Sequence, residues 1–182
     1  RITKAASRMQ NLIDALISYS KTNNAEEETK PTDLNILMDH VKESLIDSME
    51  ENKAVITSNQ LPVLRVIPVQ FQQLFINLVS NAIKYRKKDI APQINIHANL
   101  INGKDIDDQN ANKNIQYWKI SISDNGIGFE QKYQTKIFEL FQRLHSNTEY
   151  QGTGIGLAIC SKIVRNHDGI ITAEGIPNKG AT

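Results

Sequence analysis

The sequence predicts an α+β fold in which helices cover one face of a β-sheet, with a further helix ahead of this domain. Several segments repeat apolar residues at steps of three and four, which is the period of a helix. Other short stretches alternate apolar and polar residues, as half-buried strands do. Because the two kinds of segment alternate along the chain, we expect two packed layers around one core.

The composition narrows the class of protein. The 182 residues suit one domain with an appendage, and an apolar content of 40% is enough for a core. The net charge of +1 gives no basic excess for binding nucleic acid. A single cysteine, Cys160, excludes an internal disulfide. No apolar run reaches the roughly 20 residues that a membrane-spanning helix needs.

Residues 1–24 are expected to form a bundle helix. Alternating steps of four and three are typical of the seam of a coiled coil or helical bundle, and they join Ile2, Ala6, Met9, Ile13 and Leu16. A plain amphipathic helix packed on its own domain is the alternative. Residues 25–31, which end at Pro31, are expected to be a linker. Since the chain opens within this helix, we expect it to belong to a longer protein.

A second domain is expected over residues 32–182. Thr32 is the expected cap of its first helix, and Pro68 stands where a first-turn proline is tolerated. Helices are expected over residues 34–46, 68–85 and 155–167. Strands are expected over residues 55–57, 64–66, 94–98, 120–122 and 170–173, with a polar surface loop over 102–114.

A polar stripe lies beside the apolar face of the expected helix 68–85. It consists of Asn77, Asn81, Lys84 and Tyr85. Asparagine is a mediocre helix former, so two of them on this stripe point to a function. An amide oxygen is a hard ligand suited to Mg²⁺, lysine offers a point charge for phosphate, and tyrosine offers a flat face for a base. A solvated helix face is the equally weighted alternative.

Two glycine-rich turns follow. Asp124 to Gly128 comes directly after a strand, where a carboxylate can accept a hydrogen bond from an exocyclic amine, although Asp-Asn-Gly also favours a simple turn. Gly152 to Leu157 opens a helix, whose first N–H groups favour phosphate. The spacing of its glycines matches neither the dinucleotide-binding fingerprint nor the P-loop motif. Between the two turns, the aromatic segment 136–143 ends at Arg143, whose guanidinium could bind phosphate oxygens. The alternative is a short amphipathic turn of the core with a solvated arginine.

In this order and spacing, the segments resemble those of sensor histidine kinases, within the ATPase superfamily shared with gyrase, the MutL proteins and a heat-shock chaperone. They are similar to the family's asparagine, first glycine, phenylalanine and second glycine boxes: Asn77 to Tyr85, Asp124 to Gly128, Ile137 to Phe141, and Gly152 to Leu157. The resemblance covers residues 32–182, and residues 1–24 resemble the second helix of the dimerisation and histidine-phosphotransfer domain. It implies a two-layer α/β sandwich with a mixed sheet, the Bergerat-type ATP-binding fold.

The resemblance also implies residue roles on the expected helix. Asn77 would hold Mg²⁺, and Asn81 would help to position the phosphates and the metal. Lys84 and Arg143 would contact phosphate. Tyr85 would lie against the base.

Further roles fall on the two glycine turns. Asp124 would bind the adenine amine in a pocket shaped by Gly126 and Gly128. The second turn would border the phosphates with Gly152, Thr153, Gly154, Gly156 and Leu157. Residues 130–151 would form a mobile lid.

The implied activity is that of a protein-histidine kinase, which transfers the γ-phosphoryl group of ATP to a histidine of the dimerisation domain with Mg²⁺ as cofactor. The implied partners are the protein's own dimerisation domain and sensor module, and the receiver domain of a response regulator. The parent protein would be a homodimer, either soluble or membrane-anchored. The domain described by this sequence would lie in the cytoplasm. Residues 141–146 resemble kinases attached to phytochrome or PAS sensor modules.

Two departures from the family pattern limit the expected activity. Gln73 stands where ATP-hydrolysing relatives have a glutamate that activates water, and an amide cannot act as a general base near neutral pH. No histidine has the setting of the phosphoryl acceptor, so no catalytic residue is expected in this chain, and the chain should not phosphorylate itself; the four are His40, His97, His145 and His167. An ATPase or protein-serine kinase, and a non-catalytic binding module, are the alternatives.

Overall fold

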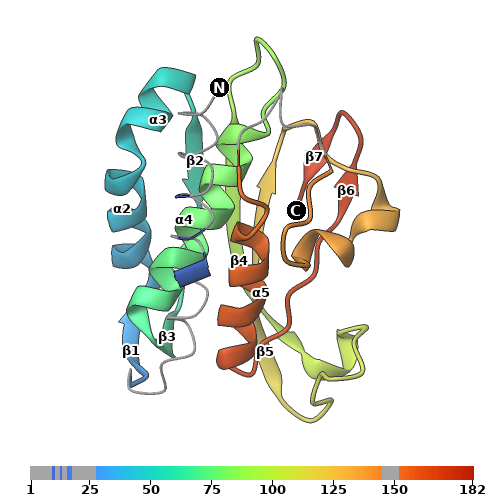
Figure 1. Cartoon of the computed structure of the whole chain (residues 1–182). Coiled ribbons are helices and arrows are strands. Elements are labelled where there is room, and N and C mark those ends of the chain that lie inside the picture. The colour runs from blue at the N-terminus through green and yellow to red at the C-terminus, as the bar shows by residue number, and fades with distance from the viewer. Residues whose placement is uncertain (1–9, 11–12, 14–15, 18–27, 145–151) are drawn as a thin grey trace.

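The computed structural model describes residues 10, 13, 16–17, 28–144 and 152–182 (Figure 1). Its helices are α2 (Leu34–Ser44), α3 (Ile46–Asn52), α4 (Pro68–Lys84) and α5 (Gly156–Asn166), with short 3₁₀ helices η1 (Gly103–Asp105), η2 (Gln131–Tyr133) and η3 (Lys136–Phe138). Its strands are β1 (Lys30–Asp33), β2 (Val55–Ser58), β3 (Val63–Val66), β4 (Gln93–Asn102), β5 (Gln116–Asp124), β6 (Gly175–Ile176) and β7 (Gly180–Ala181).

The central sheet is mixed. Its strand order is β2-β4-β5, with β2 parallel to β4 and β4 antiparallel to β5. Two small antiparallel pairs, β1-β3 and β6-β7, complete the described strands. The expected α+β architecture with a mixed sheet is therefore confirmed.

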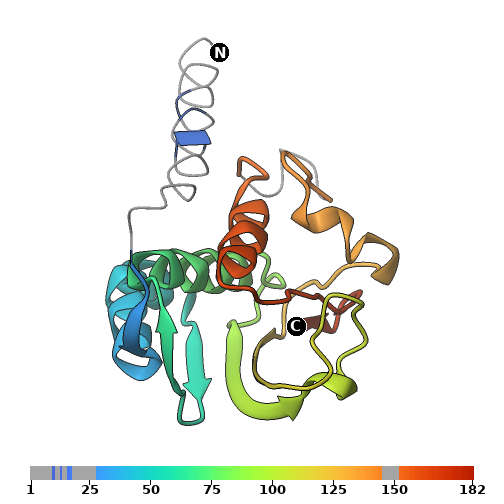
Figure 2. The same cartoon turned by 90° about the horizontal axis from the view of Figure 1, so that it is seen from below.

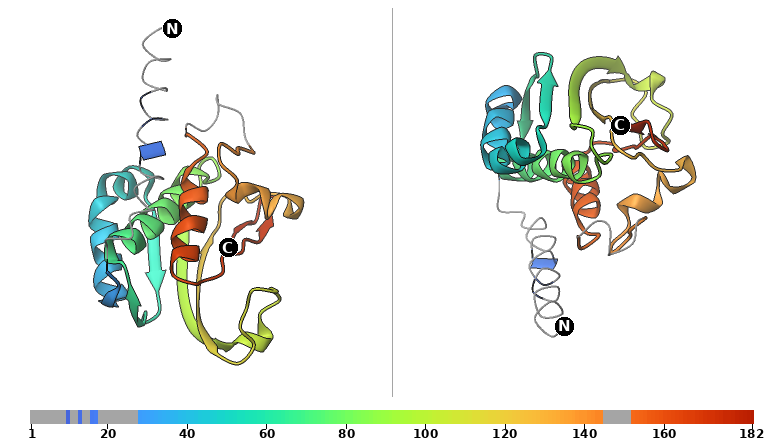
Figure 3. Two further views of the ribbon diagram at one scale, coloured as in Figure 1. Left: turned by 60° about the horizontal axis from the view of Figure 1, so that its bottom comes forward. Right: turned by 90° about the horizontal axis from the view of Figure 1, so that it is seen from above.

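The helices form one layer against the sheet, as Figures 1, 2 and 3 show. Helix α4 lies between α2 and α5 and contacts both. Along β4 the side chains alternate: Ile94, Ile96 and Ala98 are buried, whereas Asn95 and His97 are exposed. The core lies between the buried face of β4 and the apolar faces of the three helices. One face of the sheet is thus covered, as expected.

Local sequence sets where the helices begin. Pro68 occupies the first turn of α4, where its missing N–H costs nothing. The N-cap of α2 is Asp33, whose carboxylate accepts a hydrogen bond from the backbone N–H of Asn35 at 2.8 Å. The expectation that Thr32 caps this helix is therefore wrong. Thr32 lies in β1, and its hydroxyl donates to the carbonyl of Lys30 instead.

Two other expectations need correction. The helix expected over residues 34–46 breaks at Leu45, where α2 ends and α3 follows. Residues 170–173 do not form a strand in the structure. Here Ile171 packs on the core, and the carbonyl of Ala173 accepts from the side chain of Gln131 rather than from a neighbouring strand. Short apolar runs indicate burial more reliably than they indicate sheet pairing.

The N-terminal segment is described only at residues 10, 13, 16 and 17, which are helical and exposed. The rest of the bundle helix expected over residues 1–24 lies outside the described residues, as do residues 25–27 of the expected linker. Lys30 and Pro31, at the end of that linker, belong to β1. Among the described helices, none is long and apolar enough to cross a bilayer.

Candidate nucleotide-binding site

Asp124, the last residue of β5, is the carboxylate expected to bind adenine. Its Oδ1 accepts hydrogen bonds from the backbone N–H groups of Gly126 at 2.8 Å and Ala181 at 3.3 Å. Burial raises the pKa of this carboxyl above its usual 3.8, while the two N–H donors and the ammonium of Lys87 act in the opposite direction. The backbone therefore fixes the carboxylate in a partly desolvated position.

The first glycine turn is bound directly to the end of α4. The N–H of Ile127 donates to the carbonyl of Tyr85 at 2.9 Å. A Cβ on Gly126 would stand 2.5 Å from that same carbonyl oxygen, so only glycine fits this approach. On its other side the turn meets the β6-β7 hairpin, where the carbonyl of Ile176 lies against Gly128. The structure thus brings Tyr85 beside the residues that follow Asp124.

Asn77 lies in the middle of α4 and faces the start of α5. Its side-chain oxygen accepts from the amide of Gln73 at 3.0 Å, and its side-chain nitrogen donates to the carbonyl of Gly156 at 3.3 Å. Asn81 follows one turn later, and its carbonyl accepts from the N–H of Tyr85 at the helix end. The polar stripe therefore runs along α4 from the start of α5 to the first glycine turn.

Two cations meet the second glycine turn. The ammonium of Lys84 lies over the ring of Tyr85, 4.6 Å from its centroid, and also against Gly152. The guanidinium of Arg143 donates to the carbonyl of Gly152 at 3.0 Å. Gly154 has a φ of +73° and packs on the backbone next to Arg143, which favours glycine there. The turn is thus held between α4 and the segment that ends at Arg143.

Helix α5 begins directly after this turn. Its N-cap, Ile155, makes no side-chain hydrogen bond to the first turn, so that the first N–H groups have no side-chain partner from the cap. Such an N-terminus favours an anion. Thr153 and Gly156 are partly buried, and Leu157 packs against the core. Leu157 therefore has a packing role that the sequence analysis did not assign.

The resulting arrangement joins segments from four parts of the chain along α4, from the N-terminus of α5 to the first glycine turn. Lys84 and Arg143 supply positive charge there, and Asp124 lies beyond Tyr85. Among the described residues, no group of three or more His, Cys, Asp or Glu side chains could hold a metal by itself. A lone amide oxygen such as that of Asn77 suits Mg²⁺, which takes few protein ligands and keeps waters and phosphate oxygens. The residues therefore fit a Mg²⁺–nucleotide complex.

Sequence reasoning missed several members of this site. The amide of Asn125 accepts from the N–H of Gln93 and donates to the carbonyl of Ala91, which attaches the first glycine turn to the start of β4. Cys160 interacts with the side chain of Asn77. Ala181, whose N–H donates to the carboxylate of Asp124, lies 57 positions further along the chain. No local sequence pattern predicts contacts between residues this far apart in the chain.

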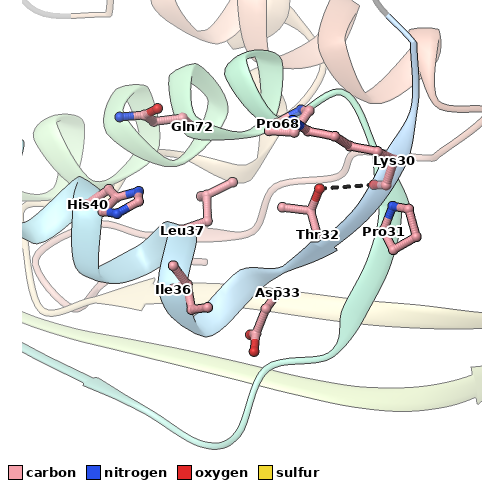
Figure 4. A pocket seen from close by; sticks show the side chains of 9 residues that line it. All are labelled: Lys30, Pro31, Thr32, Asp33, Ile36, Leu37, His40, Pro68 and Gln72. Atoms are coloured by element: carbon pink, nitrogen blue, oxygen red, sulfur yellow. Dashed lines mark hydrogen bonds between the residues drawn. The ribbon is translucent and has the colours of Figure 1, made fainter.

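A shallow hollow of about 270 Å³ lies elsewhere, between β1 and the first turns of α2 and α4 (Figure 4). Pro31, Ile36, Leu37 and Pro68 give it an apolar lining. None of the residues expected to bind nucleotide lines it. It is therefore separate from the site built around α5.

Comparison with known proteins assigns the domain to a family. The chain belongs to the histidine kinase-, DNA gyrase B-, and HSP90-like ATPases, which match residues 67–182. It is 38% identical over 179 residues to Cyanobacterial phytochrome A of Nostoc sp., covering 98% of this chain and 22% of that protein. The family expected from the four boxes is thus confirmed.

Two solved histidine kinase structures share the fold. Full-length ShkA in complex with AMPPNP aligns with a TM-score of 0.73 at 22% identity, over 98% of this chain and 35% of that chain. ThkA in complex with the response regulator protein TrrA aligns with a TM-score of 0.67 at 20% identity, over 99% of this chain and 47% of that chain. The chain spans less than a quarter of the length of the cyanobacterial phytochromes and phytochrome-like protein that it matches.

Proposed function

We propose that residues 32–182 bind ATP with Mg²⁺ and present its γ-phosphoryl group to a histidine of the protein's dimerisation domain. One observation carries the proposal: the cations Lys84 and Arg143 meet at Gly152, just before the N-terminus of α5. Tyr85, next to Lys84, is bonded to the turn that follows Asp124. The family assignment and the AMPPNP bound to ShkA support a nucleotide as the ligand.

Each residue group has a distinct part in the proposed site. Asp124 accepts a hydrogen bond from the adenine amine, and the ring of Tyr85 lies against the base. Lys84, Arg143 and the first N–H groups of α5 bind phosphate oxygens. Asn77 and Asn81 hold and position the metal, and Mg²⁺ when bound neutralises charge on the phosphates. Thr153 and the glycines of the second turn shape the backbone beside the phosphates.

The chemistry in this proposal is in-line phosphoryl transfer. The bond between the γ-phosphorus and its bridging oxygen breaks, a bond to the acceptor imidazole nitrogen forms, and ADP leaves. The chain contributes by holding the phosphates in line and by placing positive charge near them. Gln73 cannot activate water as a base, which favours transfer to a protein over hydrolysis. Steady phosphate release without an acceptor would support an ATPase instead.

The partners follow from the same proposal. The phosphoryl group passes from the acceptor histidine to the receiver domain of a response regulator, and the complex of ThkA with TrrA supports a partner of this kind. We place residues 1–24 in the second helix of the dimerisation domain, residues 25–31 in a linker, and the parent protein in a homodimer. Residues 141–146 resemble kinases attached to phytochrome or PAS sensor modules, and we assign a sensor module of this kind to the parent protein. We also place the domain in the cytoplasm, where ATP is available.

Calorimetry with a non-hydrolysable ATP analogue tests the binding step. We expect micromolar affinity, roughly −7 to −8 kcal/mol, for the wild-type chain. Asp124→Asn should abolish or greatly weaken binding, because the amide nitrogen faces the adenine amine with a donor. Asp107→Asn removes an exposed carboxylate of the β4-β5 loop and serves as the matched control. A folded wild type that does not bind, or equal affinities for the two variants, would overturn the proposed site.

Transfer is tested separately. The chain is mixed with a purified dimerisation domain and radiolabelled ATP, and labelled histidine is measured. Label on the added domain that depends on Asp124 supports the kinase, and phosphate release without labelled protein supports the ATPase. Binding without either product would leave a non-catalytic module.

A further inference from the structure

We propose that Gln73 is a positioning residue that holds the amide of Asn77 in the one orientation able to bind the metal. The inference rests on the proposed function, because it concerns the Mg²⁺ of the same site. It starts from a pair of hydrogen bonds in which Asn77 accepts from Gln73 and donates to Gly156.

An asparagine amide can bind in two orientations, which exchange its oxygen and nitrogen. The carbonyl of Gly156 is an acceptor that cannot change its role, so the nitrogen of Asn77 must face it, at 3.3 Å. The thiol of Cys160 also interacts with this side chain. The oxygen of Asn77 is thereby directed to the opposite side, where the amide nitrogen of Gln73 donates to it at 3.0 Å.

Gln73 is placed for this task by the helix itself. Residues four apart lie one above the other on the same face of α4, which brings the two amides together. An amide oxygen has two lone pairs, and Gln73 uses one of them. The second remains available for a metal ligand bond. Reversing the amide would set its oxygen against the carbonyl of Gly156, which cannot change its role, and would break the bond that Gln73 donates.

The same geometry explains why the glutamine amide suits this position. A carboxylate there would be an acceptor only, and it would face the oxygen of Asn77 without a proton to share. The glutamine therefore has a positive role in this chain, beyond the absence of a general base. Partners that orient a metal ligand from behind typically contribute 10- to 100-fold to metal affinity.

The experiment compares two leucine variants of neighbouring glutamines. Gln73→Leu removes the donor to Asn77, and Gln72→Leu, one position earlier and partly buried, is the matched control. Gln73→Met is measured in parallel, in case the branched side chain disturbs α4. The Kd of a non-hydrolysable ATP analogue is measured by calorimetry in Mg²⁺ and again in EDTA, and thermal unfolding without nucleotide is recorded for each variant.

We expect Gln73→Leu and Gln73→Met to bind the analogue like wild type in EDTA and to lose about 10- to 100-fold of affinity in Mg²⁺. Gln72→Leu should match wild type in both conditions. Equal losses in Mg²⁺ and EDTA would overturn the inference, because they indicate a purely structural role, and so would no loss in either. Wild-type binding in EDTA without any gain from Mg²⁺ would overturn it while leaving the adenine site intact. No wild-type binding at all would instead reject the proposed function, and the inference with it.

Discussion

The backbone N–H of Ile67 donates a hydrogen bond to Nε2 of His167 at 3.0 Å, across 100 positions of sequence. Ile67 is the N-cap of α4, and His167 is the C-cap of α5. Nδ1 of the same ring lies 2.7 Å from the carbonyl of Ile163, so Nδ1 carries the proton and Nε2 accepts. The imidazole thus joins the two helices that position Asn77 and the second glycine turn.

His167→Ala should destabilise the fold. The substitution leaves the backbone N–H of Ile67, a buried residue, without its acceptor. It also removes the edge-to-face contact between the rings of His167 and Phe71, whose centroids lie 4.9 Å apart. Loss of a buried partner costs about 1–3 kcal/mol. Urea unfolding measures the change in the free energy of unfolding. His97→Ala, on the exposed face of β4, is the control and should stay within about 0.5 kcal/mol of wild type. Equal effects of the two variants would contradict the assigned role.

Gly126→Ala and Gly152→Ala should behave differently. A Cβ at Gly126 meets the backbone carbonyl of Tyr85 at 2.5 Å and the carboxylate of Asp124 at 2.8 Å, neither of which can move freely. We expect a loss of about 1–3 kcal/mol in stability and a loss of nucleotide affinity. A Cβ at Gly152 meets mainly the end of the flexible Lys84 side chain, so stability should change little. Denaturant titration of both variants checks this order, and a larger loss at Gly152 would refute it.

The pH dependence of stability should reveal the partly buried carboxyl of Asp124. Burial raises its folded-state pKa above the usual 3.8, so the folded chain holds this proton more tightly than the unfolded chain does. The stabilisation is complete below 3.8 and is lost as the pH rises through the folded-state pKa. Asp124→Asn lacks this dependence. The variant should therefore gain stability relative to wild type as the pH rises, until the carboxyl is fully ionised.

Urea unfolding of both proteins from about pH 4 to pH 7 measures that difference. Asp107→Asn, on the exposed loop, controls for the change of net charge. A difference that stays constant with pH, or that falls as the pH rises, would contradict a raised pKa at Asp124.

The thiol of Cys160 should be unreactive in the folded chain. It is fully buried, and burial raises its pKa to about 12, so very little thiolate is present near neutral pH. Labelling with a thiol-specific reagent should be slow in buffer and fast in denaturing urea. Introducing a second thiol by Asn110→Cys on the exposed loop gives an internal control that reacts at once. Rapid modification of Cys160 in buffer would show that α4 and α5 separate readily.

Local pattern was enough for most elements of the fold. The start of α4 at Pro68 and the in-out alternation of β4 were predicted, because a proline and a period of two act within a few residues. The strand expected over residues 170–173 was wrong, because pairing depends on a neighbour elsewhere in the chain. The cap of α2 is Asp33 rather than Thr32, although both residue types suit a cap. Asp33 directly precedes the helix and accepts from the N–H of Asn35, whereas the hydroxyl of Thr32 donates to the carbonyl of Lys30.

The candidate site, like the fold, could be predicted from the sequence only in part. The sequence by itself determined which segments bear amides, cations and glycines, since these are properties of residue type and short spacing. Only the tertiary structure decided that Asp124 meets the N–H of Ala181, that Arg143 and Lys84 meet at Gly152, and that Asn77 lies between Gln73 and Gly156. Apart from the bond of Gln73 to Asn77 within α4 and that of Arg143 to Gly152, nine positions apart, these contacts join residues far apart in sequence. Their geometry follows from how α4, α5 and the sheet pack, which no short stretch of sequence contains.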